Sequence, residues 1–369
     1  MSKYRSLDES VLTTYSDDAR TIEINGRGRI RSLVFLKDGK YLLSGGEEAT
    51  IRQWRIDDGV EVGEGMKAGS IVTAMDLSGD GKWIISGGER VANVWSTRSR
   101  QIVVTVSEHS DWVDTVHVSP DSTKFATGSN DKCAFIWNVL TGERLVGPLE
   151  HQDRVGAVRF SPDGDRIVTG TSSQGLRVYD AHNGELLRII PVSIASYPTP
   201  IAWFRVQSIF ALVCQKTLMD IDVNTGRTSS SWTIPGTRAY LSESITFGSV
   251  ASSSNGRFIV SFLGSSVSLW DTLNSAQISS DIEHKANVQS IALSSDGRYL
   301  AMSDVNGGVT LRNLNDLVSN YYLVDPRGVV QQPRDWREDG HEAQIDALHS
   351  KLRALELRVG AFLTIPVRI

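Results

Sequence analysis

A short turn sequence recurs along this chain at a fixed spacing, and that regularity limits the fold more than any other feature. Each copy places Asp or Asn after a strand-like run, usually with Gly next; the copies begin at Asp38, Asp80, Asp121, Asp163, Asn255 and Asp296. Their separations are 42, 41, 42, 92 and 41 residues. Because 92 is about two periods, we place one more unit in the long gap, with its turn at 205–208, and predict seven repeated units.

Each unit has the pattern of a small antiparallel sheet. The best example is 109–137, where three runs at 112–118, 124–127 and 134–137 alternate between apolar and polar residues. Turn-forming residues separate these runs, which indicates strands joined by tight turns. A fourth and more polar run follows in the first four units, at 60–65, 101–106, 144–148 and 185–190.

The third unit also carries four side chains at a characteristic spacing: His109, Thr127, Asp131 and Trp137. This set, in this order, resembles the WD40 repeat family, and the resemblance covers about residues 20–315. It implies an all-β fold, a seven-bladed propeller, in which the four residues form a buried tetrad. It also implies that a terminal strand completes the last blade, so we expect residues near 20–24 to pair beside 309–314.

The other units keep only part of the tetrad. Units one, two and six retain a Ser and a Trp: Ser44 and Trp54, Ser86 and Trp95, and Ser261 and Trp270. Unit four has His151 and Thr169, with Tyr179 in the place of the Trp. Units five and seven lack the aromatic residue and have Ile221, and His284 with Met302 and Arg312. The repeat is therefore assigned from seven units in phase rather than from any single one.

The domain organisation follows from the repeats. We expect a disordered lead-in at 1–17, the propeller at 18–314 and a tail at 315–369. Within the tail, a helix is expected at 341–359, because Ile345, Leu348, Leu352 and Leu355 are spaced three or four residues apart. Two interpretations of this stripe stay open: the helix packs on the propeller or on nothing, or it contacts a partner helix or a second copy.

Composition narrows the classes of function. The net charge of −5 gives no general attraction to nucleic acid or anionic membranes, and two cysteines are too few for a disulfide framework. Neither an apolar leader nor a membrane-length apolar run occurs in the sequence. We expect a soluble intracellular protein, cytoplasmic by default, with the nucleus as the alternative compartment.

The sequence offers no motif for catalysis or cofactor binding. A P-loop, a dinucleotide fingerprint, a His-Glu-x-x-His motif and paired cysteines are all lacking. His109, Thr127 and Asp131 include the residue types of a hydroxyl–His–carboxylate catalytic set, but the family resemblance implies a buried structural network instead. We therefore predict no catalytic residue, no metal and no cofactor.

The expected function is a non-enzymatic scaffold that binds protein or peptide on one propeller face. In the family, partners commonly bind the rim formed by loops before the first strands and turns after the second strands. Residues at those positions are Ser70, Asp111, Trp112, Asn130, Asp153, Arg154, Ser172 and Asn287. Trp112 is the foremost candidate anchor, with packing against a neighbouring blade as its alternative role. Two alternative functions stay open: an enzyme with its site in the channel or a rim pocket, and a subunit of a nucleic-acid-associated complex.

Overall fold

The computed structural model describes residues 14–15, 21–25, 28–192, 201–205, 207–213, 217–233, 248–279, 281–315, 317–318 and 322. Contacts divide the chain into two units, Met1–Val324 and Asp325–Ile369. All described residues belong to the first unit. The helix expected at 341–359, with Ile345, Leu348, Leu352 and Leu355, lies outside the described residues.

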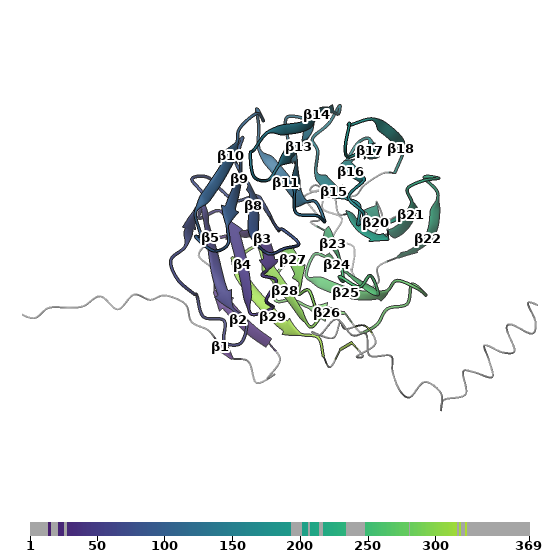
Figure 1. Ribbon diagram of the computed structural model, residues 1–369. Coiled ribbons are helices and arrows are strands. Elements are labelled where there is room, and N and C mark those ends of the chain that lie inside the picture. Colours follow the sequence, from purple (N-terminus) through teal and green to yellow (C-terminus); the bar gives the residue numbers. More distant parts are fainter. Residues whose placement is uncertain are drawn as a thin grey trace, which may run out of the picture. The chain divides into compact units, whose positions relative to one another are not determined.

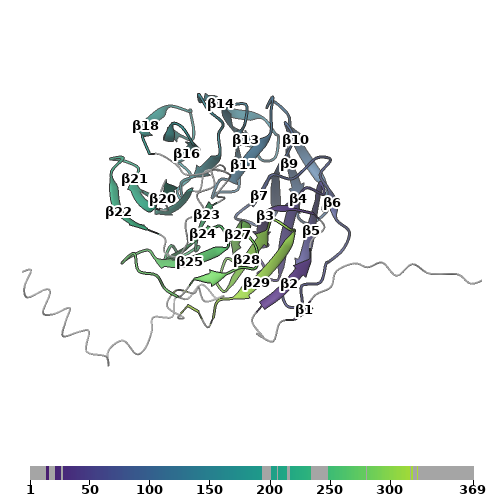
Figure 2. The same ribbon diagram turned by 180° about the vertical axis from the view of Figure 1, so that it is seen from behind.

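The first unit contains seven antiparallel sheets that follow one another around a ring (Figures 1 and 2). The first three blades are β3 (Ile30–Phe35), β4 (Tyr41–Gly46), β5 (Thr50–Arg55) and β6 (Met66–Lys67); β7 (Ala74–Leu77), β8 (Trp83–Gly87), β9 (Ala92–Ser96) and β10 (Ile102–Val106); and β11 (Val113–Val118), β12 (Lys124–Ser129), β13 (Cys133–Asn138) and β14 (Arg144–Glu150).

The next three blades have the same order of strands. They are β15 (Ala157–Phe160), β16 (Arg166–Thr171), β17 (Gly175–Asp180) and β18 (Leu186–Ile190); β19 (Ile201–Arg205), β20 (Ser208–Val213), β21 (Thr217–Asp222) and β22 (Thr228–Thr233); and β23 (Gly248–Ser252), β24 (Phe258–Leu263), β25 (Ser266–Asp271) and β26 (Ile282–Glu283). The turn of blade five falls between β19 and β20, within the expected 205–208. The seven-bladed all-β fold predicted from the repeats is therefore confirmed.

Blade seven joins the two ends of the array. It consists of β27 (Val288–Leu293), β28 (Tyr299–Asp304) and β29 (Gly308–Asn313), followed by β2 (Thr21–Asn25) and β1 (Thr14–Tyr15) from the start of the chain. β2 pairs with β29 in antiparallel register, from Thr21 opposite Arg312 to Asn25 opposite Gly308. The first strands also touch in sequence order, and β27 contacts β3. The segment expected to be a disordered lead-in, 1–17, thus contains the short strand β1.

The outer strands differ most from the sequence expectation. In blade one the fourth strand was expected at 60–65, but that segment makes only an isolated bridge, Trp54 with Glu61, and β6 forms at Met66–Lys67 instead. Blade six has the same arrangement, with a bridge from Trp270 to Gln277 and the two-residue β26. An outer strand packs on one neighbour only, so its apolar pattern is weak and a poor guide to its register.

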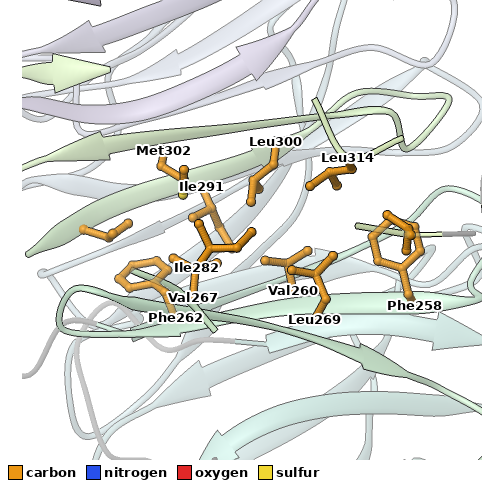
Figure 3. Packing of buried hydrophobic residues seen from close by; sticks show 12 residues of the cluster. Phe258, Val260, Phe262, Val267, Leu269, Ile282, Ile291, Leu300, Met302 and Leu314 are labelled. Carbon is orange, nitrogen blue, oxygen red and sulfur yellow. The ribbon is translucent and has the colours of Figure 1, made fainter. Parts of the chain in front are cut away.

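The hydrophobic core is divided among the gaps between blades. Each of the seven described clusters joins side chains of two adjacent blades. Figure 3 shows the cluster between blades six and seven, where Phe258, Val260 and Leu269 face Ile291 and Leu300. Beyond the last repeat, Val318 is buried in this cluster, and Tyr322 packs edge-on against Phe258. Burial of apolar surface between blades, at about 25 cal/mol per Å², supplies the main force that closes such a ring.

Glycines set how closely neighbouring blades approach. A Cβ added at Gly45 would lie 2.7 Å from a methyl carbon of Val72, and one at Gly128 would lie 2.7 Å from a methyl carbon of Val155. Val72 and Val155 each precede the first strand of the next blade and are fully buried. The glycine at this repeat position therefore makes room for the loop that begins the following blade.

Candidate functional site

The polar centre of blade three is a chain of four buried or half-buried side chains. Trp137 Nε1–H donates to Thr127 Oγ1 at 2.9 Å, Thr127 Oγ1 lies 2.7 Å from His109 Nε2, and His109 Nδ1 lies 2.8 Å from Asp131 Oδ2. Because the carboxylate can only accept, Nδ1 carries the proton; the Thr127 hydroxyl then donates to Nε2. The structure thus brings together all four residues of the expected tetrad.

Burial and hydrogen bonding fix the protonation states of this network. Burial lowers the pKa of His109 and outweighs the raising effect of Asp131, so the imidazole stays neutral. Burial tends to raise the pKa of Asp131, but hydrogen bonds from the Ser110 amide and from His109 hold it below its usual value. Thr127 is fully buried, so its hydroxyl is out of reach of a substrate. The arrangement is suited to support the blade rather than to catalyse.

The other blades contain shortened versions of the network. In blades one, two and six the indole donates to a serine, at 2.7 Å from Trp54 to Ser44, 2.9 Å from Trp95 to Ser86 and 3.0 Å from Trp270 to Ser261. In blade four His151 Nε2 lies 2.7 Å from Thr169 Oγ1 and its Nδ1 lies 2.9 Å from the Leu149 carbonyl. Each version pairs the polar groups it retains.

In blade seven the histidine also has a hydroxyl partner, but the hydroxyl comes from a residue on another strand. Met302 occupies the place of the hydroxyl, yet His284 Nε2 lies 2.8 Å from Thr310 Oγ1. Thr310 stands directly opposite Met302 in the β28–β29 register. The hydroxyl partner of His284 therefore lies on the third strand of the blade, one strand further out than in blades three and four.

The eight rim residues occupy one edge of the sheets. In each blade the start of the first strand pairs with the end of the second, as Val113 does with Ser129 and Val288 with Asp304. Loops before the first strands and turns after the second strands therefore meet at the same edge. The loops contribute Ser70, Asp111, Trp112, Asp153, Arg154 and Asn287, and the turns contribute Asn130 and Ser172.

Several of these rim residues also hold the loops in place. Ser70 Oγ accepts the Glu89 amide at 3.2 Å, and Ser172 donates to Asp153 Oδ2 at 2.9 Å. Asp111 Oδ1 accepts the Trp112 amide at 2.7 Å, and the Trp112 carbonyl accepts the Asn130 amide at 2.9 Å. Asp111, Arg154 and Asn287 are exposed, and the Trp112 side chain is half-buried.

A second polar group lies inside the ring, and sequence reasoning missed it. Asp76, His117 and Arg159, on the first strands of blades two, three and four, all line a central cavity of about 690 Å³. Their positions differ by 41 and 42, the repeat period itself. That spacing was the available signal, since residues at one repeat position on inner strands converge when the ring closes.

Burial shifts the ionisation of this inner group. It raises the pKa of Asp76 to about 6, against the lowering effect of hydrogen bonds and Arg159, and it lowers the pKa of His117 to about 3. Within the described part of the chain there is no cluster of three or more His, Cys, Asp or Glu side chains able to hold a metal ion. Among those same residues, no helix is long and apolar enough to cross a membrane.

Comparisons with known proteins agree with this architecture. The sequence profile of the WD domain, G-beta repeat, matches residues 19–55, 63–96, 100–138 and 144–180. No curated protein sequence matches the chain. Among solved structures, the WD40 beta propeller domain of Doa1 is similar with a TM-score of 0.67 and 16% identity, over 84% of this chain and 100% of that one. The chain therefore carries four WD40 repeats that the family profile recognises, within 19–180, and they form part of a seven-bladed propeller.

Proposed function

We propose that this protein is a non-enzymatic scaffold that binds a protein or peptide partner on the rim defined by the eight residues above. WD40 propellers generally serve as platforms for protein interactions. The observation that carries the proposal is the convergence of loops from blades two, three, four and seven on one edge of the sheets, with their backbones fixed by hydrogen bonds. Loops held on a rigid framework lose little conformational entropy when a partner binds.

Trp112 is the residue we propose as the anchor of this rim. Its amide and its carbonyl are both hydrogen-bonded, to Asp111 and Asn130, so the backbone beneath the indole is fixed. The side chain is half-buried, which leaves apolar ring surface for a partner to cover. Large aromatic side chains in such settings commonly contribute the largest share of binding energy.

Neither alternative function has a comparable observation behind it. Among the eight rim residues, Asp111 and Asp153 carry negative charge and Arg154 alone carries positive charge, whereas nucleic-acid binding needs a basic face. Both oxygens of Asp76, the carboxyl group with the raised pKa, accept backbone amides, from Leu77 and Val118. These two hydrogen bonds tie Asp76 to the inner strands of blades two and three. The helical contact through Ile345, Leu348, Leu352 and Leu355 stays a prediction, as do the domain boundaries at 18 and 314.

The experiment compares partners captured by the wild-type chain, by Trp112→Ala and by a matched control, Leu140→Ala. Leu140 is an exposed apolar residue, 67% accessible, in the turn between the third and fourth strands of blade three, at the opposite edge of the sheet. Proteins retained from extracts of the native cells are quantified by mass spectrometry, and the affinity of each retained protein is then measured with purified components. Loss of a hot-spot side chain weakens binding by about tenfold or more.

We expect Trp112→Ala to lose at least one partner that Leu140→Ala keeps, with both variants as thermally stable as the wild type. Equal retention and equal affinity for all three chains would remove Trp112 from the binding surface. A similar loss with both variants would contradict the assignment of binding to this rim.

A further inference from the structure

The inner strands place chemically different residues at one repeat position around the central cavity. Asp76, His117 and Arg159 lie on blades two to four, whereas the same position on the remaining blades holds small or aliphatic residues, Ala202, Ala251, Ala292 and Val34. All seven line the cavity of about 690 Å³. At this repeat position the channel is therefore polar on three consecutive blades and apolar on the other four.

The hydrogen bonds of His117 determine which of its nitrogens is a donor. The Phe160 amide of the next blade donates to His117 Nδ1 at 3.1 Å, so this nitrogen carries no proton. Burial, together with the charge of Arg159, lowers the pKa of His117 to about 3, so the ring is neutral at physiological pH. The proton therefore sits on Nε2, and none of the described residues accepts it.

Arg159 is a cation held without an ion pair. Its Nη1 donates to the Val158 carbonyl at 2.8 Å and to Thr115 Oγ1 at 3.3 Å. Among the described residues, no group accepts from Nε or Nη2, and none of the ion pairs includes Arg159. Nε and Nη2 form one edge of the guanidinium, with two parallel N–H groups that match the two oxygens of a carboxylate.

We propose that the polar sector formed by Asp76, His117 and Arg159 binds a carboxylate group, with Arg159 Nε and Nη2 donating to its two oxygens and His117 Nε2 adding a third donor. The wall of Ala202, Ala251 and Ala292 faces apolar atoms of the ligand. This site lies inside the channel, separate from the rim proposed above, and it does not depend on that proposal. The carboxylate can belong to a small organic acid or to an acidic residue of a peptide, because the same donors serve both.

Binding at this site is coupled to the proton on Asp76. Burial raises the pKa of Asp76 to about 6, and a second carboxylate nearby raises it further, because two negative charges in one cavity repel each other. The ligand is therefore bound with uptake of a proton, and binding tightens as pH falls through 6. The other ionisable residues that line the cavity are Arg31, Lys37 and Asp114.

The test titrates the full chain by calorimetry with succinate, and separately with a blocked peptide containing one Glu, at constant ionic strength. Succinamide is the uncharged control ligand. Arg159→Gln removes the cation, and Arg98→Gln, at an exposed arginine in a turn of blade two, is the matched control. We expect saturable binding of succinate, of the peptide or of both, and none of succinamide.

Affinity should fall about tenfold or more in Arg159→Gln, stay unchanged in Arg98→Gln, and be higher below pH 6 than above it. The ligand that binds identifies the source of the carboxylate. If Arg159→Gln does not fold, the Trp203 indole N–H of the wild type, which donates to the Arg159 carbonyl at 3.0 Å, serves as an NMR reporter of occupancy. An unshifted Trp203 signal with no saturable binding of either probe up to about 50 mM would overturn the proposal. Equal affinity of wild type and a folded Arg159→Gln would also overturn it.

Discussion

Blades three and five form the same four-stranded sheet, but the interior of blade three holds a polar hydrogen-bonded network and the equivalent positions of blade five are apolar. In blade three the centre is the chain from Trp137 through Thr127 and His109 to Asp131. In blade five the places of Thr127 and Trp137 are taken by Ala211 and Ile221, and both are fully buried. A blade therefore does not need the polar network. It needs polar groups that are present or replaced together, because removing one partner leaves another buried and unsatisfied.

The largest effect is expected from Thr127→Val, which keeps the shape of the side chain and removes its hydroxyl. Trp137 Nε1–H loses its acceptor and His109 Nε2 loses its donor, so two buried groups become unpaired. We expect the free energy of unfolding to fall by about 2–6 kcal/mol, at 1–3 kcal/mol for each group. Chemical denaturation measures the change.

Thr123→Val is the control for that substitution, because Thr123 is exposed in the turn between β11 and β12. Its hydroxyl donates only an exposed hydrogen bond, to Asp121, so the change in stability should stay below about 1 kcal/mol. If Thr127→Val were no more destabilising than Thr123→Val, the hydroxyl would not couple the indole to the imidazole.

A smaller loss is expected from Asp131→Ala. This change leaves the buried His109 Nδ1–H without its acceptor, together with the more exposed amides of Ser110 and Cys133. The expected cost is about 1–3 kcal/mol. Asp131→Asn retains an acceptor oxygen and should cost less than Asp131→Ala. Equal thermal stability of Asp131→Ala and the wild type would show that the carboxylate is dispensable.

A pH dependence of stability is also expected, and it comes from the histidines of blades three and four. Burial, with a contribution from the charge of Arg177, lowers the pKa of His151 to about 4 from 6.5, and burial also lowers the pKa of His109. The unfolded chain then takes up protons that the folded chain does not. The stability these neutral rings contribute is complete above 6.5 and is lost as pH falls towards 4.

The contribution of Asp76 to stability changes with pH in the opposite direction. Because burial raises its pKa from 3.8 to about 6, its contribution is present below 3.8 and is lost as pH rises to 6. His151→Gln should therefore flatten the fall in unfolding free energy between pH 6.5 and 4, measured by denaturation across that range. An unchanged slope would show that His151 takes up a proton as readily in the folded chain as in the unfolded one.

The sequence was sufficient for the features that repeat. The fixed turn spacing and the alternating runs predicted seven sheets, and the spacing of His109, Thr127, Asp131 and Trp137 predicted which side chains would meet. These features depend on local periodicity, which one strand after another displays.

Features produced by closing the ring could not be anticipated in the same way. Asp76, His117 and Arg159 share a repeat position, as their spacing of 41 and 42 residues indicates, but because they differ in chemistry no common motif marks them as one group. The use of Thr310 in place of Met302 depends on a cross-strand register. The outer strand of blade one forms at Met66–Lys67 rather than at the expected 60–65, because the weak apolar pattern there does not determine which residues pair.

The direction of the hydrogen bonds through blade three is the most direct test of this account. Nitrogen-15 NMR of the His109 ring near neutral pH reports which nitrogen carries the proton. We predict a neutral ring with the proton on Nδ1, facing Asp131, and an unprotonated Nε2 that accepts from Thr127. A proton on Nε2, or a ring charged at neutral pH, would contradict the continuous network that distinguishes blade three from blade five.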